Sequence, residues 1–229
     1  MRLICIPGLG GHPSVFAEYI ALLPEYELRS IEFVNRQKAL TDARAALAAE
    51  KTPVILFCHC YSAQMGIQLA AEMPEKVSRL VFLEPYFVEF HTWMYIFRPL
   101  IWSLREITRF FGWIGLRRRT FTYQPDYITL AKYPIYIQPF FDMRWQNLTD
   151  YFDKCYDILT YKLPPSVLTP TLMIFSPQGF FRNPAKRERL KKVFSRLHIV
   201  ETQTGTHNVI TMGAAPVAAM IREFLNSAT

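Results

Sequence analysis

The sequence predicts an α/β fold in which a mostly parallel sheet is interrupted once by a long helical segment. Three observations lead to this prediction. Short apolar runs alternate with segments of helical periodicity in the first third of the chain, this alternation stops near Pro85 and resumes after Pro165, and 51% of the residues are hydrophobic. A strand–helix alternation favours parallel strands covered by helices on both faces. We therefore expect a sheet of about six strands around one core.

The expected strands and helices follow from apolar spacing and from the Gly and Pro residues between them. Strands are expected at residues 2–6, 27–33, 53–57, 78–83, 171–175 and 198–200. Helices are expected at residues 13–23, 39–50, 63–73, 184–193 and 214–225. The Gly-rich turn "PGLGGH" separates the first strand from the first helix.

The middle of the chain has a different composition. Residues 85–165 contain 22 of the 34 aromatic residues and all four tryptophans, without strand–helix alternation. We therefore predict an α/β core formed by residues 1–84 and 166–229, and a helical, aromatic-rich cap formed by residues 85–165.

Composition and charge limit the classes of function. The four cysteines form no disulfide framework, the first strand begins too early for a signal peptide, and no apolar run approaches the roughly 18 residues of a membrane-spanning helix. A cytoplasmic location is expected. The formal net charge is +7, but no nucleic-acid motif accompanies it, so no nucleic-acid partner is expected. Peripheral contact with an anionic membrane remains an alternative.

The run "FCHCYS", residues 57–62, joins an expected strand to an expected helix. A residue at such a sharp turn has strained backbone angles and needs small neighbours two positions before and after it. Around Cys60 these neighbours are Cys58 and Ser62, whereas around Ser62 they would include the larger Gln64. The pattern therefore favours Cys60 over Ser62 as a nucleophile. A helix N-terminus and a nearby histidine both favour the reactive thiolate; the alternative is an inert buried thiol.

This run resembles the G-H-S-x-G nucleophile turn of the α/β-hydrolase superfamily, and "AAEMPEKVSRLVFLEP" resembles the sequence that follows it there. The resemblance covers the core, residues 1–84 and 166–229, but not the cap. Both glycines of the motif are replaced, and a cysteine stands where serine is usual. Cysteine at this place is known in dienelactone hydrolases, polyhydroxyalkanoate synthases and some cyclising enzymes of polyketide pathways.

The resemblance implies a set of partners for Cys60. The run "TGTHNVI" resembles the histidine loop of the superfamily, which makes His207 the expected general base. The backbone amides of Leu9, in the Gly-rich turn, and of Tyr61, after the nucleophile, are the expected oxyanion donors. His12 is expected to line the substrate pocket.

The acid departs from the usual pattern. The loop after residues 171–175, which usually carries an aspartate, contains no acidic residue, and Gly179 stands near the expected place. Some haloalkane dehalogenases carry the acid at the end of the strand after the nucleophile helix, and here that strand ends in Glu84. A carboxylate there is costly to bury without a partner. Glu84 is therefore the predicted third catalytic residue, with a solvated strand end as the alternative.

These features together predict a cysteine-dependent acyl-transfer enzyme, whether hydrolase, thioesterase or cyclase, acting on an ester or thioester with an apolar acyl group. The substrate is a small molecule, with an acyl carrier protein or coenzyme A as candidate carriers, and no metal or organic cofactor is indicated. Trp93 and Trp102 of the cap are expected to line the acyl pocket, with membrane contact or simple packing as alternatives. The competing hypothesis is a non-catalytic relative that binds an apolar ligand.

Overall fold

The computed structural model describes most of the chain. The residues described are 1–8, 16–32, 36–87, 92–113, 145–177, 179, 181, 183–203 and 213–227. They fall into two compact units, one formed by Met1–Phe87 with Leu163–Thr229 and the other by Val88–Lys162.

The first unit is built on a six-stranded sheet in the order β2-β1-β3-β4-β5-β6. All neighbouring strands are parallel, which confirms the predicted fold class. The strands are β1 (Arg2–Ile6), β2 (Glu27–Ser30), β3 (Val54–His59), β4 (Val77–Leu83), β5 (Thr171–Phe175) and β6 (Leu197–Glu201). The central strands are almost entirely buried, as their unbroken apolar runs require, whereas the edge strands β2 and β6 are partly exposed.

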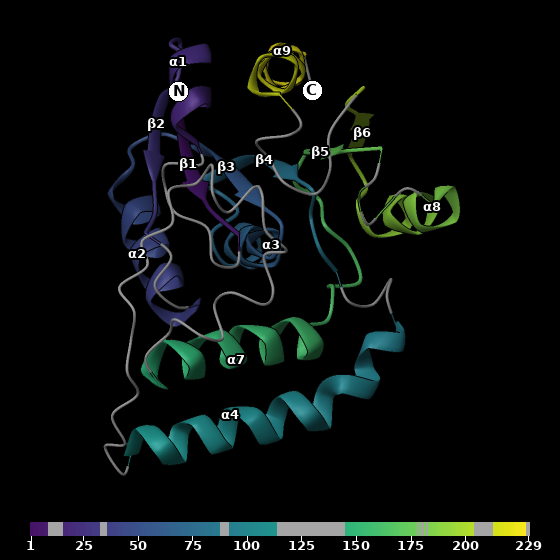
Figure 1. Ribbon diagram of the computed structural model, residues 1–229. Coiled ribbons are helices and arrows are strands. Elements are labelled where there is room, and N and C mark those ends of the chain that lie inside the picture. Colours follow the sequence, from purple (N-terminus) through teal and green to yellow (C-terminus); the bar gives the residue numbers. More distant parts are fainter. Residues whose placement is uncertain are drawn as a thin grey trace. The chain divides into compact units, whose positions relative to one another are not determined.

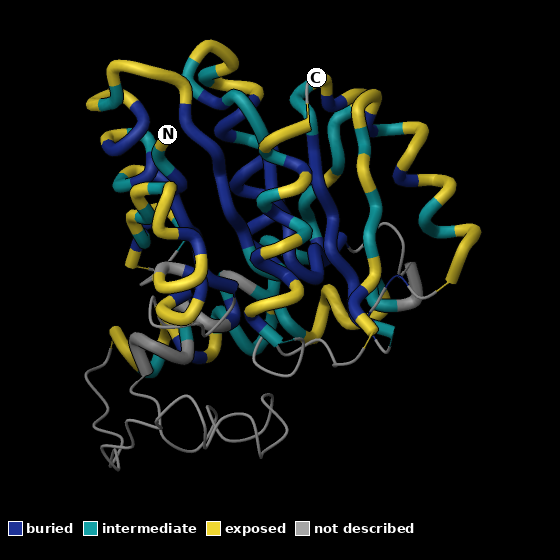
Figure 2. The backbone as a smooth tube through the Cα atoms, turned by 90° about the horizontal axis from the view of Figure 1, so that it is seen from above, coloured by how far each residue is buried: buried dark blue, intermediate teal, exposed yellow. Residues whose placement is uncertain are grey.

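Helices cover both faces of this sheet (Figure 1). The helices of the first unit are α1 (Ala17–Leu22), α2 (Arg36–Ala49), α3 (Ser62–Glu72), α8 (Pro184–Val193) and α9 (Ala214–Asn226). α1 packs beside α9, and α2 packs beside α3, which lies against β3 and β4. Figure 2 shows the central strands as buried tubes, surrounded by helices that alternate between buried and exposed residues.

A glycine allows α3 to lie close to the sheet. A Cβ atom on Gly66 would lie 2.9 Å from the Cys58 sulfur and 3.1 Å from a ring carbon of Phe82. The side chain of Cys58 on β3 therefore fits beneath the helix only because residue 66 has no side chain. Gly66 thus makes room for Cys58, one of the two residues that replace glycines in the turn motif.

The second unit contains a 3₁₀ helix, η3 (Thr92–Phe97), and two long helices, α4 (Arg98–Trp113) and α7 (Trp145–Thr160). α4 and α7 pack along each other. Arg105 and Arg109 of α4 both form ion pairs with Asp153 of α7. The described part of this unit is helical, and its action as a cap remains a prediction.

Candidate active site

The turn between β3 and α3 is centred on Cys60. Cys60 has a φ angle of +54°, in the left-handed region that non-glycine residues rarely adopt. Its N–H donates to the carbonyl of Leu83 (2.9 Å), and its own carbonyl accepts from the N–H groups of Ala63 (3.2 Å) and Tyr86 (3.3 Å). Such a conformation costs about 1–2 kcal/mol, and these hydrogen bonds offset that cost. The strained residue is therefore the one that the motif predicts.

Ser62 has a structural task instead. Its side chain is fully buried. Its hydroxyl lies 2.6 Å from the carbonyl oxygen of Ile6 and 2.8 Å from that of His59, and it accepts the N–H of His59 (2.9 Å). Because a hydroxyl has one proton and two lone pairs, these contacts occupy it. Ser62 thus ties the end of β1 to the turn and is poorly placed to act as a nucleophile.

The four thiols differ in their surroundings. Cys5 and Cys58 are buried, and their burial raises the pKa of both thiols, which favours the neutral form. Cys60 is partly accessible, and so is Cys155 on α7. Cys60 is therefore the accessible thiol of the first unit.

The end of β1 lies directly against the turn. A Cβ atom on Gly8 would lie 2.9 Å from Nδ1 of His59 and 3.1 Å from Cβ of Cys60. Only a glycine permits this approach. The Gly-rich segment expected to supply an oxyanion donor therefore begins beside Cys60, and the other expected donor, Tyr61, follows Cys60 and is buried. Leu9 and His12 lie outside the described residues.

Glu84 occupies the equivalent position at the end of the next strand. It has a φ angle of +45°, and its N–H donates to the carbonyl of Ile174 (2.9 Å). Its side chain is completely buried, and its Oε1 accepts the backbone N–H of Ser176. Glu84 is therefore not a solvated strand end. The N–H of Ser176 supplies the partner that a buried carboxylate needs.

The carboxylate of Glu84 fills the space above Gly179. A Cβ atom on Gly179 would overlap both carboxylate oxygens and would lie 2.7 Å from the carboxylate carbon. Gly179 also donates its N–H to the carbonyl of Ser176 (3.0 Å). Gly179 stands near the usual position of the acid after β5. The carboxylate of Glu84, which follows β4, thus occupies the space that the Cβ atom of an acid at position 179 would take.

Parallel register brings these groups to one edge of the sheet. His59 pairs with Leu83, and Leu83 pairs with Ile174, so Cys60 and Glu84 each lie just beyond a paired residue. Beyond β6, the N–H of Thr202 donates to the carbonyl of Phe175 (2.8 Å). The connection between β6 and α9, which carries His207, therefore starts beside Phe175. The next residue, Ser176, is the hydrogen-bond partner of Glu84. His207 itself lies outside the described residues.

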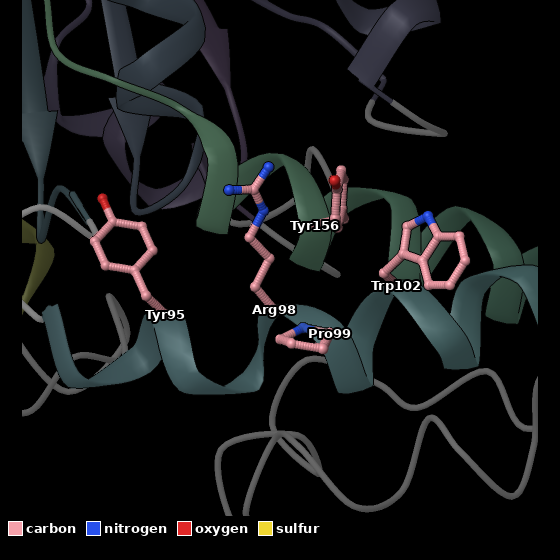
Figure 3. Close-up of a pocket in the computed structure, with 5 residues that line it drawn as sticks. All are labelled: Tyr95, Arg98, Pro99, Trp102 and Tyr156. Carbon is pink, nitrogen blue, oxygen red and sulfur yellow. The ribbon is translucent and has the colours of Figure 1, made fainter.

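The second unit contains a hollow of about 410 Å³ (Figure 3). It is lined by Tyr95, Arg98, Pro99, Trp102 and Tyr156. Arg98 extends from α4 toward α7, and its guanidinium carbon lies 5.7 Å from the ring centre of Tyr156. Trp102, predicted to line an acyl pocket, lies at this hollow and is 51% exposed. The side chain of Trp93 lies outside the described residues.

Sequence reasoning missed the groups that support the site. The motif requires only a small residue at position 62. It does not indicate that the hydroxyl of Ser62 forms hydrogen bonds with Ile6 and His59. The N–H of Ser176 is a backbone group and leaves no trace in the sequence. The glycine at 179 was the available signal, because a small residue can make room for an incoming carboxylate. Among the described residues, no cluster of His, Cys, Asp and Glu side chains could hold a metal ion.

Comparison with known proteins identifies the fold. No protein-family model matches the chain, and no curated protein matches its sequence. An epoxide hydrolase from Bacillus megaterium, solved with an inhibitor, has a TM-score of 0.66 at 13% identity, covering 99% of this chain and 93% of that one. The enol-lactonase from Burkholderia xenovorans has a TM-score of 0.65 at 15% identity, covering 99% of this chain and 91% of that one. The chain has an α/β-hydrolase fold.

A third α/β-hydrolase structure is similar along most of its length. The thioesterase domain from the curacin biosynthetic pathway has a TM-score of 0.59 at 18% identity, covering 96% of this chain and 90% of that one. At these identities the likeness establishes the fold alone. The chemistry of this α/β-hydrolase fold must therefore be argued from its own residues.

The contact between Glu84 and Gly179 predicts a coupled effect on stability. Gly179→Ala should lower the free energy of unfolding by about 1–3 kcal/mol, because the added methyl group overlaps the buried carboxylate. In a Glu84→Gly background the same change should cost less than about 0.5 kcal/mol, since the overlapping group is gone. Urea unfolding of the four proteins in this cycle gives the coupling free energy. Equal losses in both backgrounds would contradict the contact.

Proposed function

We propose that this protein is a cysteine-dependent acyl-transfer enzyme that acts on an ester or thioester with an apolar acyl group. The observation that carries the proposal is the left-handed conformation of Cys60 between β3 and α3. Strain of this kind persists where the surrounding structure fixes it, and it is concentrated at functional sites. Here it holds a partly accessible thiol at the N-terminal end of α3.

In the proposed reaction the thiolate of Cys60 attacks the carbonyl carbon of the substrate. The negative charge that forms on the carbonyl oxygen is stabilised by the backbone amides of Leu9 and Tyr61. His207 holds the proton taken from the thiol and gives it to the alkoxide or thiolate that leaves when the tetrahedral intermediate collapses. His207 then removes a proton from water, or from a hydroxyl or amine of the acyl chain, and the new nucleophile releases the acyl group from the sulfur.

Glu84 is the proposed orienting acid. A catalytic histidine needs an acceptor on its second ring nitrogen to hold its tautomer and orientation. Glu84 has a buried carboxylate at the correct edge of the sheet, and Ser176, which binds it, is next to the start of the connection that carries His207. A cysteine–histidine pair can form an ion pair by itself, so the acid contributes less here than in a serine enzyme.

The departures from the usual turn motif have structural compensations, which support an enzyme over a non-catalytic binding protein. Cys58 replaces one glycine of the motif and is accommodated by Gly66. Ser62 replaces the other and clamps β1 to the turn. The missing acid after β5 is matched by Glu84 above Gly179. With these contacts the turn holds Cys60 in a left-handed conformation and partly accessible although both motif glycines are replaced, as a nucleophile requires.

The proposed substrates are acyl thioesters and esters. Thioesterase domains from biosynthetic pathways are among the similar structures, as is an enol-lactonase. An acyl carrier protein or coenzyme A is the proposed carrier for a thioester. His12, Trp93 and Trp102 are proposed to contact the acyl group, and the apolar character of the second unit is the basis for an apolar acyl chain.

Substitutions at the turn test which residue is the nucleophile. Cys60→Ala should abolish turnover of thioesters without loss of fold, and Cys60→Ser should leave weak activity, because a hydroxyl needs stronger base assistance than a thiol. Ser62→Ala should keep substantial activity while lowering the free energy of unfolding by about 1–3 kcal/mol, because it removes buried hydrogen bonds. Kinetics and urea unfolding measure both effects. An inactive but stable Ser62→Ala protein, beside an active Cys60→Ala protein, would contradict the assignment.

Removing the carboxylate from position 84 and placing one at position 179 tests whether Glu84 is the orienting acid. Glu84→Gln should lower kcat by on the order of tenfold to a thousandfold, because the carboxylate charge is lost from the acceptor of His207. Glu84→Gly should lower kcat by a similar factor, and glycine readily adopts the left-handed conformation of residue 84. Adding Gly179→Asp to Glu84→Gly places a carboxylate at the usual acid position and should restore at least about tenfold in kcat/KM.

The matched control for the moved carboxylate is Gly179→Asn in the same Glu84→Gly background. It has nearly the same size and shape as aspartate but no charge, so it should restore nothing. Equal recovery of kcat/KM with aspartate and asparagine would indicate that the substitution restores packing and not the function of an acid. Full activity in Glu84→Gln would remove Glu84 from the proposed mechanism.

A further inference from the structure

The exposed large apolar side chains of this protein are concentrated on one helical segment. Of the ten such side chains among the described residues, seven lie between residues 96 and 113. They are Ile96, Phe97, Leu100, Trp102, Ile107, Phe110 and Trp113. Scattered apolar residues on a surface need no explanation, but a group gathered on one segment marks an interaction site. Trp102 lines the hollow beside Tyr156 of α7, which leaves the other six as the candidate interaction site.

The side of α4 that faces α7 is charged. Arg98, Arg105 and Arg109 follow one another at helical spacing and lie on one side of the helix. Arg105 and Arg109 bind Asp153 of α7, and the guanidinium groups of Arg98 and Arg105 lie within 5.7 Å and 5.1 Å of the ring centre of Tyr156. The charged side of α4 is therefore already occupied by α7.

The opposite side of α4 is apolar and open. Leu100 and Ile107 are 54% and 48% exposed, and their spacing places them about half a turn from the arginines. Ile96, in η3 just before the helix, is 76% exposed. Trp113, at the C-terminal end of the helix, is 83% exposed. A helix that packs only against a neighbouring helix turns its apolar side inward. α4 does the reverse, so its apolar side, which we call the outer face, is directed at something other than α7.

We propose that the outer face of α4 binds the surface of a membrane that contains anionic lipid. Charge favours such a partner. Arg98, Arg105 and Arg109 contact α7, but three further arginines, at positions 117–119, follow α4 in the sequence, Glu106 is the single acidic residue between positions 96 and 119, and the net charge of the chain is +7. Leucine, isoleucine, phenylalanine and tryptophan beside arginine are the composition of helices that lie in the boundary between headgroups and acyl chains. No helix among the described residues is long and apolar enough to cross a membrane. The proposed contact is therefore one of a helix lying along the surface.

The size of the outer face argues against a second copy of the chain as its partner. α4 has 16 residues, which makes it about 24 Å long, and at about 10 Å wide it would bury on the order of 500 Å² in total between two copies. Stable dimers bury at least roughly 1,200 Å². A lipid surface has no such requirement, because acyl chains and headgroups adapt to a narrow helix. The inference does not depend on which reaction the first unit performs.

Vesicle binding tests this inference. The full-length protein should co-sediment with vesicles of phosphatidylcholine and phosphatidylglycerol at least about tenfold more strongly than with phosphatidylcholine alone, and added salt should weaken the binding. The double variant Ile107→Ser with Phe110→Ser should lose about tenfold or more in this partitioning, because it removes two side chains that enter the lipid. Both changes are at exposed positions, so circular dichroism should remain unchanged.

The matched control is Leu168→Ser, which replaces a side chain that is 72% exposed but lies outside α4. It should bind vesicles as well as the unmodified protein does. Absence of binding to anionic vesicles, or equal binding by the double variant, would overturn the proposal. A dimer in analytical ultracentrifugation that dissociates in the double variant, together with absence of lipid binding, would overturn it in favour of a second copy.

Discussion

The candidate site depends on the parallel register of β3, β4 and β5. Because these strands run in the same direction and end in line, the residues that follow them meet at one edge of the sheet. At the first two of these ends the chain turns through a left-handed residue, Cys60 and then Glu84. In both cases the strained residue donates its N–H to the end of the neighbouring strand. The sheet thus fixes two unfavourable conformations with the same hydrogen-bonding pattern.

Three glycines make this edge of the sheet compact enough to form a site. Gly8 lets the end of β1 approach Cys60, Gly66 makes room for Cys58, and Gly179 makes room for the carboxylate of Glu84. A Cβ atom at any of the three would collide with a group at or beside the site. Cys58, which stands in place of a motif glycine, therefore depends on Gly66, and the carboxylate of Glu84 depends on Gly179.

Much of the fold could be predicted from the sequence, because the apolar runs of buried parallel strands and the periodicity of the helices are strong signals. β1, β5 and α8 have the predicted bounds. β2 ends three residues early, at Ser30, because an edge strand has a weaker apolar pattern. The left-handed turn at Cys60 was also predictable, since strain requires small neighbours. The burial of Glu84 excludes the alternative of a solvated strand end. The roles of Cys60, Glu84, Tyr61 and Trp102 remain predictions. Those of His207, Leu9, His12 and Trp93 also remain predictions, and these residues or their side chains lie outside the described part of the chain.

Other features could not be predicted, for physical reasons. The partner of Glu84 is a backbone amide, which every residue at position 176 except proline would supply. The hydroxyl of Ser62 forms its bonds with carbonyl and amide groups that come together only when β1 and β3 are paired. The spacing of residues in α4 shows that the helix has two different sides, but it does not reveal that the arginines face α7 and the apolar residues face outward.

The central claim is that an acyl group is transferred to Cys60, and mass spectrometry of the protein after incubation with acyl thioesters and esters tests it directly. The intact mass should increase by one acyl group for reactive substrates, and peptide mapping should locate this group on the peptide that contains residues 57–62. Hydroxylamine should remove the group, as it does from thioesters. Acylation at Cys155 alone, at a rate no greater than that of an unfolded thiol, or an adduct on Ser62, would contradict the account.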